Sequence, residues 1–221
     1  MGIAQTIELH GYAHLRAHLP DLTSERALSV IGTLETVSGR GPIQALTPKQ
    51  VNDSQPNTYS GNFGISEFPL HTDLAYWSIP PRYVALRCVG GATNVHTKLL
   101  VGDNLVSKIG KNNLQVTLAQ PRRPINARMH LLRLLDRHSK QKLDILRWDE
   151  IFIKPATEKS KCTFDLFRKY LSEEEILEVC LSEPGDTLII DNWRCFHGRS
   201  SAPNSSNRHI DRAYLTSINL K

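Results

Sequence analysis

The 221-residue sequence is 40% hydrophobic and 22% charged, the composition of an ordinary globular protein that can bury a full core. No apolar run is long enough for a membrane-spanning helix. The net charge of +5 is mild and has no nucleic-acid-binding motif beside it, so no nucleic-acid partner is expected, whereas an acidic substrate or cosubstrate would suit it. The four cysteines lack CxxC spacing, which predicts free thiols in the cytoplasm.

The first part of the chain, residues 1–55, is predicted to be a helical preamble. The stretch "YAHLRAHLP" (12–20) is expected to be a helix that ends at Pro20. A second helix is expected over "TSERALSVIGTL" (23–34), where Thr23 or Ser24 can cap the N-terminus. A loop rich in Asn, Ser and Gly follows.

The rest of the chain is expected to consist mainly of strands. Runs rich in β-branched or aromatic residues, bounded by Gly, Pro or Asn, predict strands at 82–89, 162–167, 186–192 and 212–220. Two further helices are expected: an amphipathic one with a basic face over 127–142, and one over 172–181. Many short strands with helices mainly at the front predict an α+β protein built on a β-sandwich or barrel.

One short stretch, "PLHTDLAYW" (69–77), contains a histidine and an aspartate separated by one residue. Side chains of an extended strand alternate between its faces, so His71 and Asp73 would point the same way. Taken alone, this pattern is more typical of an ordinary strand with two polar residues on its solvent-exposed face.

A second stretch, "EPGDTLIIDNWRCFHGRSS" (183–201), reads as a turn, a buried strand and a second turn. It would deliver His197 after a tight reversal of the chain. Two imidazoles and one carboxylate form the facial triad of non-haem Fe(II) oxygenases. Structural zinc sites instead prefer closed sets of four ligands with thiolates, so the combination indicates iron.

A third signal is the segment "NRHIDRAYL" (207–215), in which Arg208, Ile210, Arg212 and Tyr214 would share one strand face. A buried arginine is costly unless it meets an anion. A guanidinium binds a carboxylate through two parallel hydrogen bonds, as a dicarboxylic cosubstrate would require.

With these residues in view, the chain resembles the Fe(II)/2-oxoglutarate-dependent dioxygenases of the TauD/TfdA-like group, which includes taurine dioxygenase, γ-butyrobetaine hydroxylase and clavaminate synthase-like enzymes. The matching blocks follow the family order from about residue 57 to the C-terminus: "HTD", "PP", "GGAT", "GDTLIIDNWRCFHGR" and "NRHIDR". The piece "DNWRCFHGR" is the most specific and is similar to the carnitine-pathway hydroxylases.

The resemblance implies a double-stranded β-helix, the jelly-roll or cupin-like barrel, with flanking helices. It implies one domain over 1–221, with the barrel core at 57–221. The expected cofactors are Fe(II), the cosubstrate 2-oxoglutarate and O2. The expected reaction oxidises, most simply hydroxylates, a C–H bond of a small polar metabolite such as an amino acid or natural-product intermediate, with release of succinate and CO2.

The resemblance also implies a role for individual residues. His71, Asp73 and His197 fall at the positions of the iron ligands. Arg208 and Thr93 fall at the positions that bind 2-oxoglutarate, although Ala92 stands where the family more often has an acidic residue. Arg212 falls where a second arginine binds the cosubstrate or the anionic group of the substrate.

Glu67 and Trp77 are the candidate substrate contacts, since they flank the first two ligands. Two alternatives stay open: a non-catalytic jelly roll, and a cupin-like metal protein that does not use 2-oxoglutarate. The sequence leaves the prime substrate, the oxidative outcome and the oligomeric state undetermined.

Overall fold

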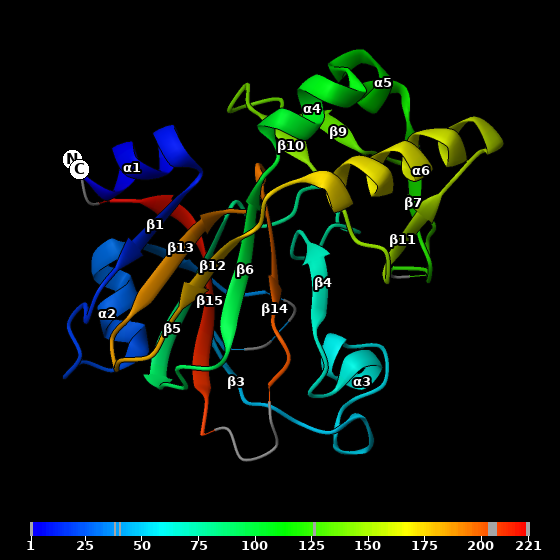
Figure 1. The fold of residues 1–221 in the computed structure, drawn as a ribbon. Coiled ribbons are helices and arrows are strands. Elements are labelled where there is room, and N and C mark those ends of the chain that lie inside the picture. The colour runs from blue at the N-terminus through cyan, green and yellow to red at the C-terminus, as the bar shows by residue number, and fades with distance from the viewer. Residues whose placement is uncertain (1, 38, 40, 126, 203–206, 220–221) are drawn as a thin grey trace.

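Two antiparallel sheets face each other in the computed structural model, which describes residues 2–37, 39, 41–125, 127–202 and 207–219 (Figure 1). The larger sheet has six strands: β1 (Tyr12–Leu15), β13 (Thr187–Asp191), β5 (Tyr83–Gly90), β15 (His209–Ile218), β2 (Gly32–Glu35) and β3 (Ile43–Leu46). The long strand β15 pairs with β5 on one side and with β3 and then β2 on the other. The fold class is thus mixed α and β with antiparallel sheets.

The smaller sheet has four strands: β12 (Leu177–Cys180), β6 (His96–Val101), β14 (Cys195–Arg199) and β4 (Phe68–His71). Two minor sheets lie beyond it and consist of β7 (Leu118–Pro121), β8 (Leu132–Arg133) and β11 (Ile153–Pro155), and of β9 (Leu135–Arg137) and β10 (Asp144–Leu146). The helices are α1 (Ile3–His10), α2 (Ser24–Ile31), α3 (Tyr59–Phe63), α4 (Asp103–Ile109), α5 (Lys111–Val116) and α6 (Glu158–Glu173), with a 3-10 turn η1 at Val51–Asp53. No helix among the described residues is long and apolar enough to cross a bilayer.

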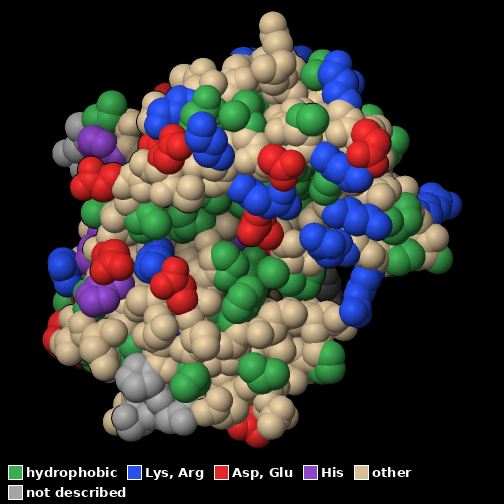
Figure 2. Space-filling model, turned by 45° about the vertical axis from the view of Figure 1, so that its right-hand side comes forward, with side chains coloured by type: hydrophobic (Ala, Val, Ile, Leu, Met, Phe, Trp, Pro, Cys, Tyr) green, Lys and Arg blue, Asp and Glu red, His purple; other side chains and the backbone are tan. Residues whose placement is uncertain are grey.

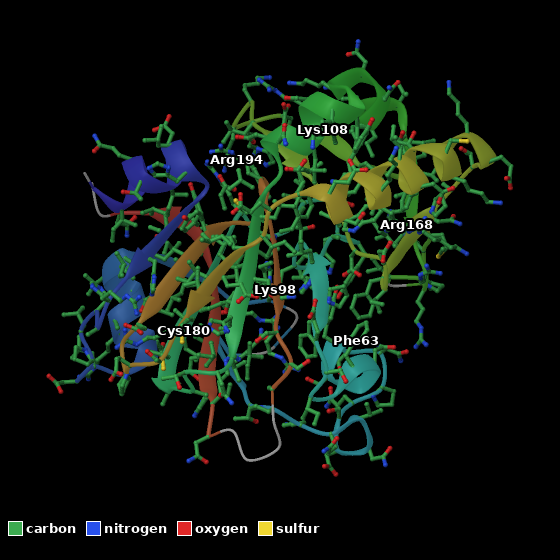
Figure 3. All side chains as sticks on the ribbon, in the orientation of Figure 1. Phe63, Lys98, Lys108, Arg168, Cys180 and Arg194 are labelled. Carbon is green, nitrogen blue, oxygen red and sulfur yellow. The ribbon has the colours of Figure 1, made fainter. Side chains whose placement is uncertain are left out.

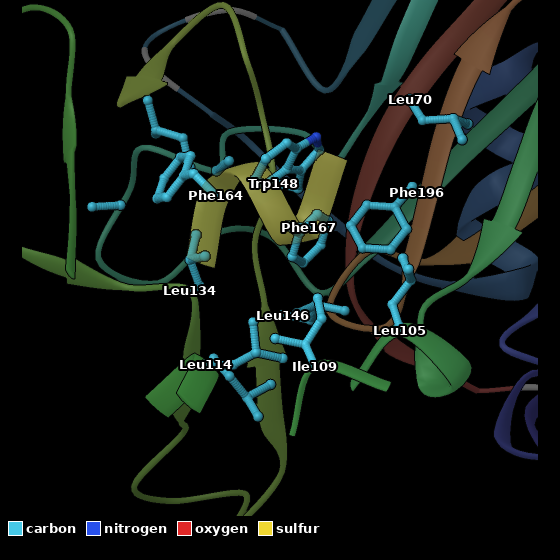
Figure 4. Packing of buried hydrophobic residues seen from close by; sticks show 14 of the residues in the cluster. Leu70, Leu105, Ile109, Leu114, Leu134, Leu146, Trp148, Phe164, Phe167 and Phe196 are labelled. Carbon is cyan, nitrogen blue, oxygen red and sulfur yellow. The ribbon is translucent and has the colours of Figure 1, made fainter. Parts of the chain in front are cut away.

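Strand alternation divides the core into layers. In β5, Val84 and Leu86 point toward the smaller sheet and meet Leu99 of β6, whereas Tyr83 and Ala85 point toward the helices α1 and α2. A third cluster lies between the smaller sheet and the helices α4 to α6, and Figure 4 shows its aromatic centre. The smaller sheet therefore buries side chains on both faces, with Leu99 in the core between the sheets and Leu100 in the third cluster.

Several predicted elements are confirmed. The helix predicted over 23–34 is α2, whose N-cap Thr23 accepts a hydrogen bond from the Arg26 amide. The helix ends at Ile31, however, and residues 32–34 belong to β2. The strands predicted at 82–89 and 186–192 are β5 and β13. The strand predicted at 212–220 is the second half of β15, although Leu220 lies outside the described residues.

The predicted helix over 12–20 is wrong, and so is the purely helical preamble. Tyr12–Leu15 is a strand that pairs with β13, and the helix precedes it at Ile3–His10, where Gly11 ends it with a φ of 81°. Glycine reaches this left-handed conformation without steric cost. Pairing at the edge of a sheet has outweighed local helix propensity, and residues 1–55 supply three strands of the larger sheet.

Three other elements were predicted with the wrong period. Residues 162–167 lie inside α6, because Phe164 and Phe167 are buried on one helical face. The helix predicted over 172–181 is instead the end of α6 followed by β12, which pairs with β6. The helix predicted over 127–142 is replaced by β8 and β9.

The cluster around α6 gives a stability prediction. Phe167 is fully buried and stacks on Trp148 with ring centroids 4.1 Å apart. Phe167→Ala is expected to lower the free energy of unfolding by about 3–5 kcal/mol, through lost apolar burial and the cavity left behind. Leu131→Ala, at a side chain that is 64% exposed, is the control and should change it by less than about 0.5 kcal/mol. Equal urea midpoints for both variants would contradict this packing.

Candidate active site

His71, Asp73 and His197 lie together on the inner side of the smaller sheet. His71 is the last residue of β4, and His197 is its direct partner on β14. One atom of each residue can be chosen so that all three lie within 4.8 Å of one another, and all three residues are buried. The Asp73 Oδ1 atom is 3.5 Å from the Nε2 atom of His71 and 3.6 Å from that of His197.

Asp73 reaches this position from a turn, since β4 ends at His71. The expectation of two alternating residues on one extended strand is therefore wrong in detail, although the two side chains do converge. Leu74 has a φ of 54°, a conformation that a residue with a branched side chain adopts only under constraint. The backbone at this turn is thus held in place by its surroundings.

The main constraint is the side-chain amide of Asn192. The Asp73 amide donates to the Asn192 Oδ1 atom at 2.7 Å, and the Asn192 Nδ2 atom donates to the carbonyls of Asp73 and Pro81 at 3.0 and 2.9 Å. Asn192 is fully buried and lies in the turn between β13 and β14. One side chain therefore joins the turn that carries Asp73 to the hairpin that carries His197.

The turn beyond Asp73 is fixed by Arg147. Its guanidinium donates to the carbonyls of Ala75, Trp77 and Ser78. Arg147 is completely buried, and burial lowers its pKa to about 10. Three carbonyls bound by the two Nη atoms of one buried guanidinium restrict the shape of this loop.

The ionisation of the three clustered residues suits metal binding. Burial alone would raise the pKa of Asp73, but the Arg212 guanidinium and the two imidazoles hold it well below its usual range. Burial and the neighbouring His71 lower the pKa of His197. The His71 Nδ1 atom lies 2.9 Å from the Pro69 carbonyl, which can only accept, so the lone pair of that ring is at Nε2. The site thus offers one carboxylate and two imidazoles whose Nε2 atoms face Asp73.

The second oxygen of Asp73 has its own partners. Arg212 donates to Oδ2 at 3.0 Å and Tyr214 donates to it at 3.0 Å, both from β15 of the opposite sheet. Arg212 also donates to the Gln44 side chain on β3 at 2.8 Å. Burial and the nearby Asp73 raise the pKa of Tyr214, so its phenol keeps its proton.

A cavity of about 480 Å³ opens over the three clustered residues. As expected from strand alternation, Arg208, Ile210, Arg212 and Tyr214 all line it. Its other walls come from β3, from residues 53–60 and from the ends of β4 and β14. The volume lies within the range of small-ligand sites.

One end of this cavity carries buried polar side chains that face each other across strands. Thr97 of β6 is the direct partner of Arg199 on β14, two residues beyond His197. The Thr97 hydroxyl is buried and has no hydrogen-bond partner among the described residues. Burial and Arg208 lower the pKa of Arg199 to about 10, and burial lowers that of Arg208 to about 10. Two buried guanidiniums near one unpaired hydroxyl form a natural receptor for an anion.

The structure does not bring every predicted residue to the cavity. Thr93 is exposed on the connection between β5 and β6, and Thr97, four residues further on, takes the place in the cavity wall. Glu67 forms an ion pair with Lys98 at 2.7 Å, on the strand where Figure 3 labels Lys98. Trp77 packs against the core between the sheets, since Arg147 holds its backbone. Neither Glu67 nor Trp77 lines the cavity.

Sequence reasoning missed Thr97 and Asn192, and it placed Tyr214 on the correct strand face without finding its contact with Asp73. Ala92 in "GGAT" was the available warning that Thr93 is misplaced. Thr97 could have been found from the alternation of "HTKLLV", which puts it on the same face as Leu99. The role of Asn192 depends on a turn more than 100 residues away, which no local pattern contains.

No protein-family model matches the chain, and no curated protein sequence matches it either. Its fold does match solved structures. PvcB from Pseudomonas aeruginosa has a TM-score of 0.69 and 17% identity over 96% of this chain and 78% of that one, and PvcB is described as an Fe, α-ketoglutarate-dependent oxygenase. OrfP in complex with Fe and α-ketoglutaric acid, which is 2-oxoglutaric acid, has a TM-score of 0.71 and 19% identity over 96% and 78%.

A third neighbour is asparagine oxygenase in complex with Fe(II), 3-hydroxyasparagine and succinate. Its TM-score is 0.64 and its identity 16%, over 84% of this chain and 60% of that one. Matches at such low sequence identity show a shared fold only. A shared fold does not by itself determine the reaction. The chain has the fold of the iron- and 2-oxoglutarate-dependent oxygenases, the fold that its sequence motifs predicted.

Proposed function

We propose that the protein is an Fe(II)- and 2-oxoglutarate-dependent dioxygenase that oxidises a C–H bond of a small polar metabolite. The observation that carries this proposal is the meeting of two imidazoles and one carboxylate in a cavity that is also lined by buried guanidiniums. The oxygenases with the same fold support it, and so does the order of motifs in the sequence.

His71, Asp73 and His197 would hold the iron. The donor set fits, because two imidazoles and one carboxylate leave an open face on the metal, as non-haem iron oxygenases require. When bound, Fe(II) supplies oxygen activation, coupled to conversion of 2-oxoglutarate to succinate and CO2. The protein's part is to orient the reactants and to exclude water.

Arg208, Arg199 and Thr97 would bind the distal carboxylate of 2-oxoglutarate. Arg208 directly precedes β15 of the larger sheet, whereas Thr97 and Arg199 belong to the smaller sheet. An anion between Arg208 and the other two residues would therefore be held from both sheets. Arg199 already uses its Nη2 atom for the carbonyls of Gly64 and Ser66, so its main contribution is charge. The unpaired Thr97 hydroxyl would gain a partner on binding.

The substrate would enter over residues 44–60. This segment lines the cavity and carries the polar side chains Gln44, Asn57 and Thr58. Neighbours of the same fold are in complex with hydroxylated asparagine or arginine, which supports an amino acid or a similar zwitterion as the substrate. With Glu67 and Trp77 outside the cavity wall, this segment is the better candidate for specificity.

We also propose that the two facing sheets form the double-stranded β-helix of this family, within one domain that spans the chain. The shared cores between sheets and helices support this view. The four cysteines are free thiols, which supports a location in the reducing environment of the cytoplasm. On the face seen in Figure 2, basic side chains are interspersed with acidic ones, and Arg168 pairs with Glu150 and Asp165, which disfavours a nucleic-acid partner.

The reaction itself can be tested without the prime substrate. Fe(II)-loaded protein is expected to consume O2 and form succinate only when 2-oxoglutarate is present, at a slow uncoupled rate that candidate amino acids accelerate. His71→Ala, Asp73→Ala and His197→Ala should each abolish succinate formation while the melting temperature stays close to the unaltered value. Oxygen consumption without 2-oxoglutarate would support a cupin-like enzyme instead, and full activity of Asp73→Ala would contradict the ligand assignment.

A second prediction concerns the concentration of 2-oxoglutarate that the enzyme requires, and it compares Thr97 in the cavity wall with the exposed Thr93. Arg208→Ala should raise the 2-oxoglutarate requirement roughly 30-fold or more, since losing a charge-assisted pair costs about 2–5 kcal/mol. Arg208→Lys should recover only part of it. Thr97→Val should raise the requirement roughly tenfold, because a hydrogen bond to a charged group is worth about 1.5–3 kcal/mol.

Thr93→Val is the control, because Thr93 is exposed and lies outside the cavity wall. It should leave the 2-oxoglutarate titration unchanged. If Thr93→Val impairs cosubstrate binding and Thr97→Val does not, the position predicted from the sequence is the correct one.

A further inference from the structure

We propose that Tyr214 and Arg212 are positioning residues that restrict Asp73 to binding the metal through one oxygen atom. This inference rests on the proposed function, because it concerns how the same site presents its ligands. The family resemblance had implied that Arg212 binds 2-oxoglutarate or the substrate directly. In the present proposal it acts on the metal centre instead, through Asp73.

The two oxygens of Asp73 lie in different surroundings. Oδ1 faces the two imidazoles, at 3.5 and 3.6 Å from their Nε2 atoms. Oδ2 accepts from the Tyr214 hydroxyl at 3.0 Å and from Arg212 at 3.0 Å. Arg212 reaches Oδ1 only at 3.3 Å. Oδ1 is therefore the atom presented to a metal, and Oδ2 is held by hydrogen bonds.

The two donors are themselves fixed. Tyr214 is 2% exposed and belongs to the core between the sheets, so its ring has little freedom to rotate away. Arg212 is held by the Gln44 side chain and lies over the Tyr214 ring at 5.3 Å. Both residues come from β15, two positions apart, and therefore share a strand face.

Holding Oδ2 has a chemical consequence. A carboxylate that bound through both oxygens would occupy one more position on the metal. Bidentate 2-oxoglutarate needs two of the open positions and oxygen needs another, so a second Asp73 oxygen would compete with oxygen. Partners behind a ligand of this kind fix its orientation in other metal sites as well.

The experiment counts the water molecules on a bound paramagnetic ion, and it does not depend on turnover. Mn(II) is titrated into the metal-free protein, and water-proton relaxation per bound ion is measured before and after addition of 2-oxoglutarate. Tyr214→Phe removes one donor while keeping the ring. In this variant the second oxygen is free to bind, so relaxation per ion should fall by roughly one third and should be nearly lost once 2-oxoglutarate is added.

After 2-oxoglutarate is added, the unaltered protein should keep part of its water-proton relaxation per bound ion, because one water position on the ion remains. Tyr83→Phe is the matched control, because it also removes one phenol hydroxyl. Tyr83 lies on the neighbouring strand β5, and its ring packs on the side of the sheet that faces α1 and α2. It should behave like the unaltered protein. Arg212→Gln removes the other donor to Oδ2 and should lower the enhancement in the same direction, even if Tyr214→Phe folds poorly.

Equal relaxation in Tyr214→Phe, Arg212→Gln and the unaltered protein would overturn this inference and leave the proposed function standing. Failure of the unaltered protein to bind Mn(II) or Fe(II) at all would overturn the proposed function and this inference with it.

Discussion

The pair of backbone hydrogen bonds between Asp73 and the Asn192 side chain is the interaction on which the site depends. The two histidines are positioned by sheet pairing, since His71 and His197 are direct partners on β4 and β14. Asp73 has no strand to hold it, and the turn that contains it includes Leu74 at positive φ. The buried amide of Asn192 supplies the missing constraint, because it satisfies the Asp73 amide and carbonyl together and also bonds to the Pro81 carbonyl. Satisfied buried polar groups of this kind favour one conformation over its alternatives.

Charge is distributed through the cavity in a way that suits an anionic cosubstrate. Asp73 is neutralised by Arg212, whereas Arg199 is bonded to backbone carbonyls and gains no carboxylate partner among the described residues. Burial lowers the pKa of both Arg199 and Arg208 to about 10, and the nearby Arg208 also lowers that of Arg199. Burying two guanidiniums in one cavity wall is costly, and a carboxylate bound between them would offset that cost.

Much of the site could be predicted from the sequence, and the reasons differ from residue to residue. His71, Asp73 and His197 stood out because their residue types suit a metal, and the family resemblance assigned them as iron ligands. The same resemblance assigned Arg208 to the cosubstrate, which stays a prediction. The alternation of Arg208, Ile210, Arg212 and Tyr214 on one face is a local property of a strand, and the cavity lining confirms it. Asn192 and the contact of Tyr214 with Asp73 depend on pairs of residues far apart in the chain, so no window of sequence contains them.

The same distinction explains the fold. The buried strands β5 and β13 could be predicted because their sequences are rich in β-branched or aromatic residues and lie between turn residues. The helix α2 could be predicted from its N-cap. β1 was missed because it is a short edge strand whose conformation is set by pairing with β13. The aromatic residues of 162–167 suggested a strand, but their spacing fits a helix face against Trp148, which comes from another part of the chain. Local pattern specified the centre of the larger sheet, and tertiary contacts specified its edges.

The most direct test of the central claim is the visible spectrum of the protein with Fe(II) and saturating 2-oxoglutarate in the absence of oxygen. Chelation of the ion by the oxo-acid at the His71, Asp73 and His197 site is expected to give a weak charge-transfer band that is absent with either component alone. The band should be lost in His197→Ala. Protein that demonstrably carries iron but shows no such band would contradict the assignment of this cavity as a 2-oxoglutarate-dependent iron site.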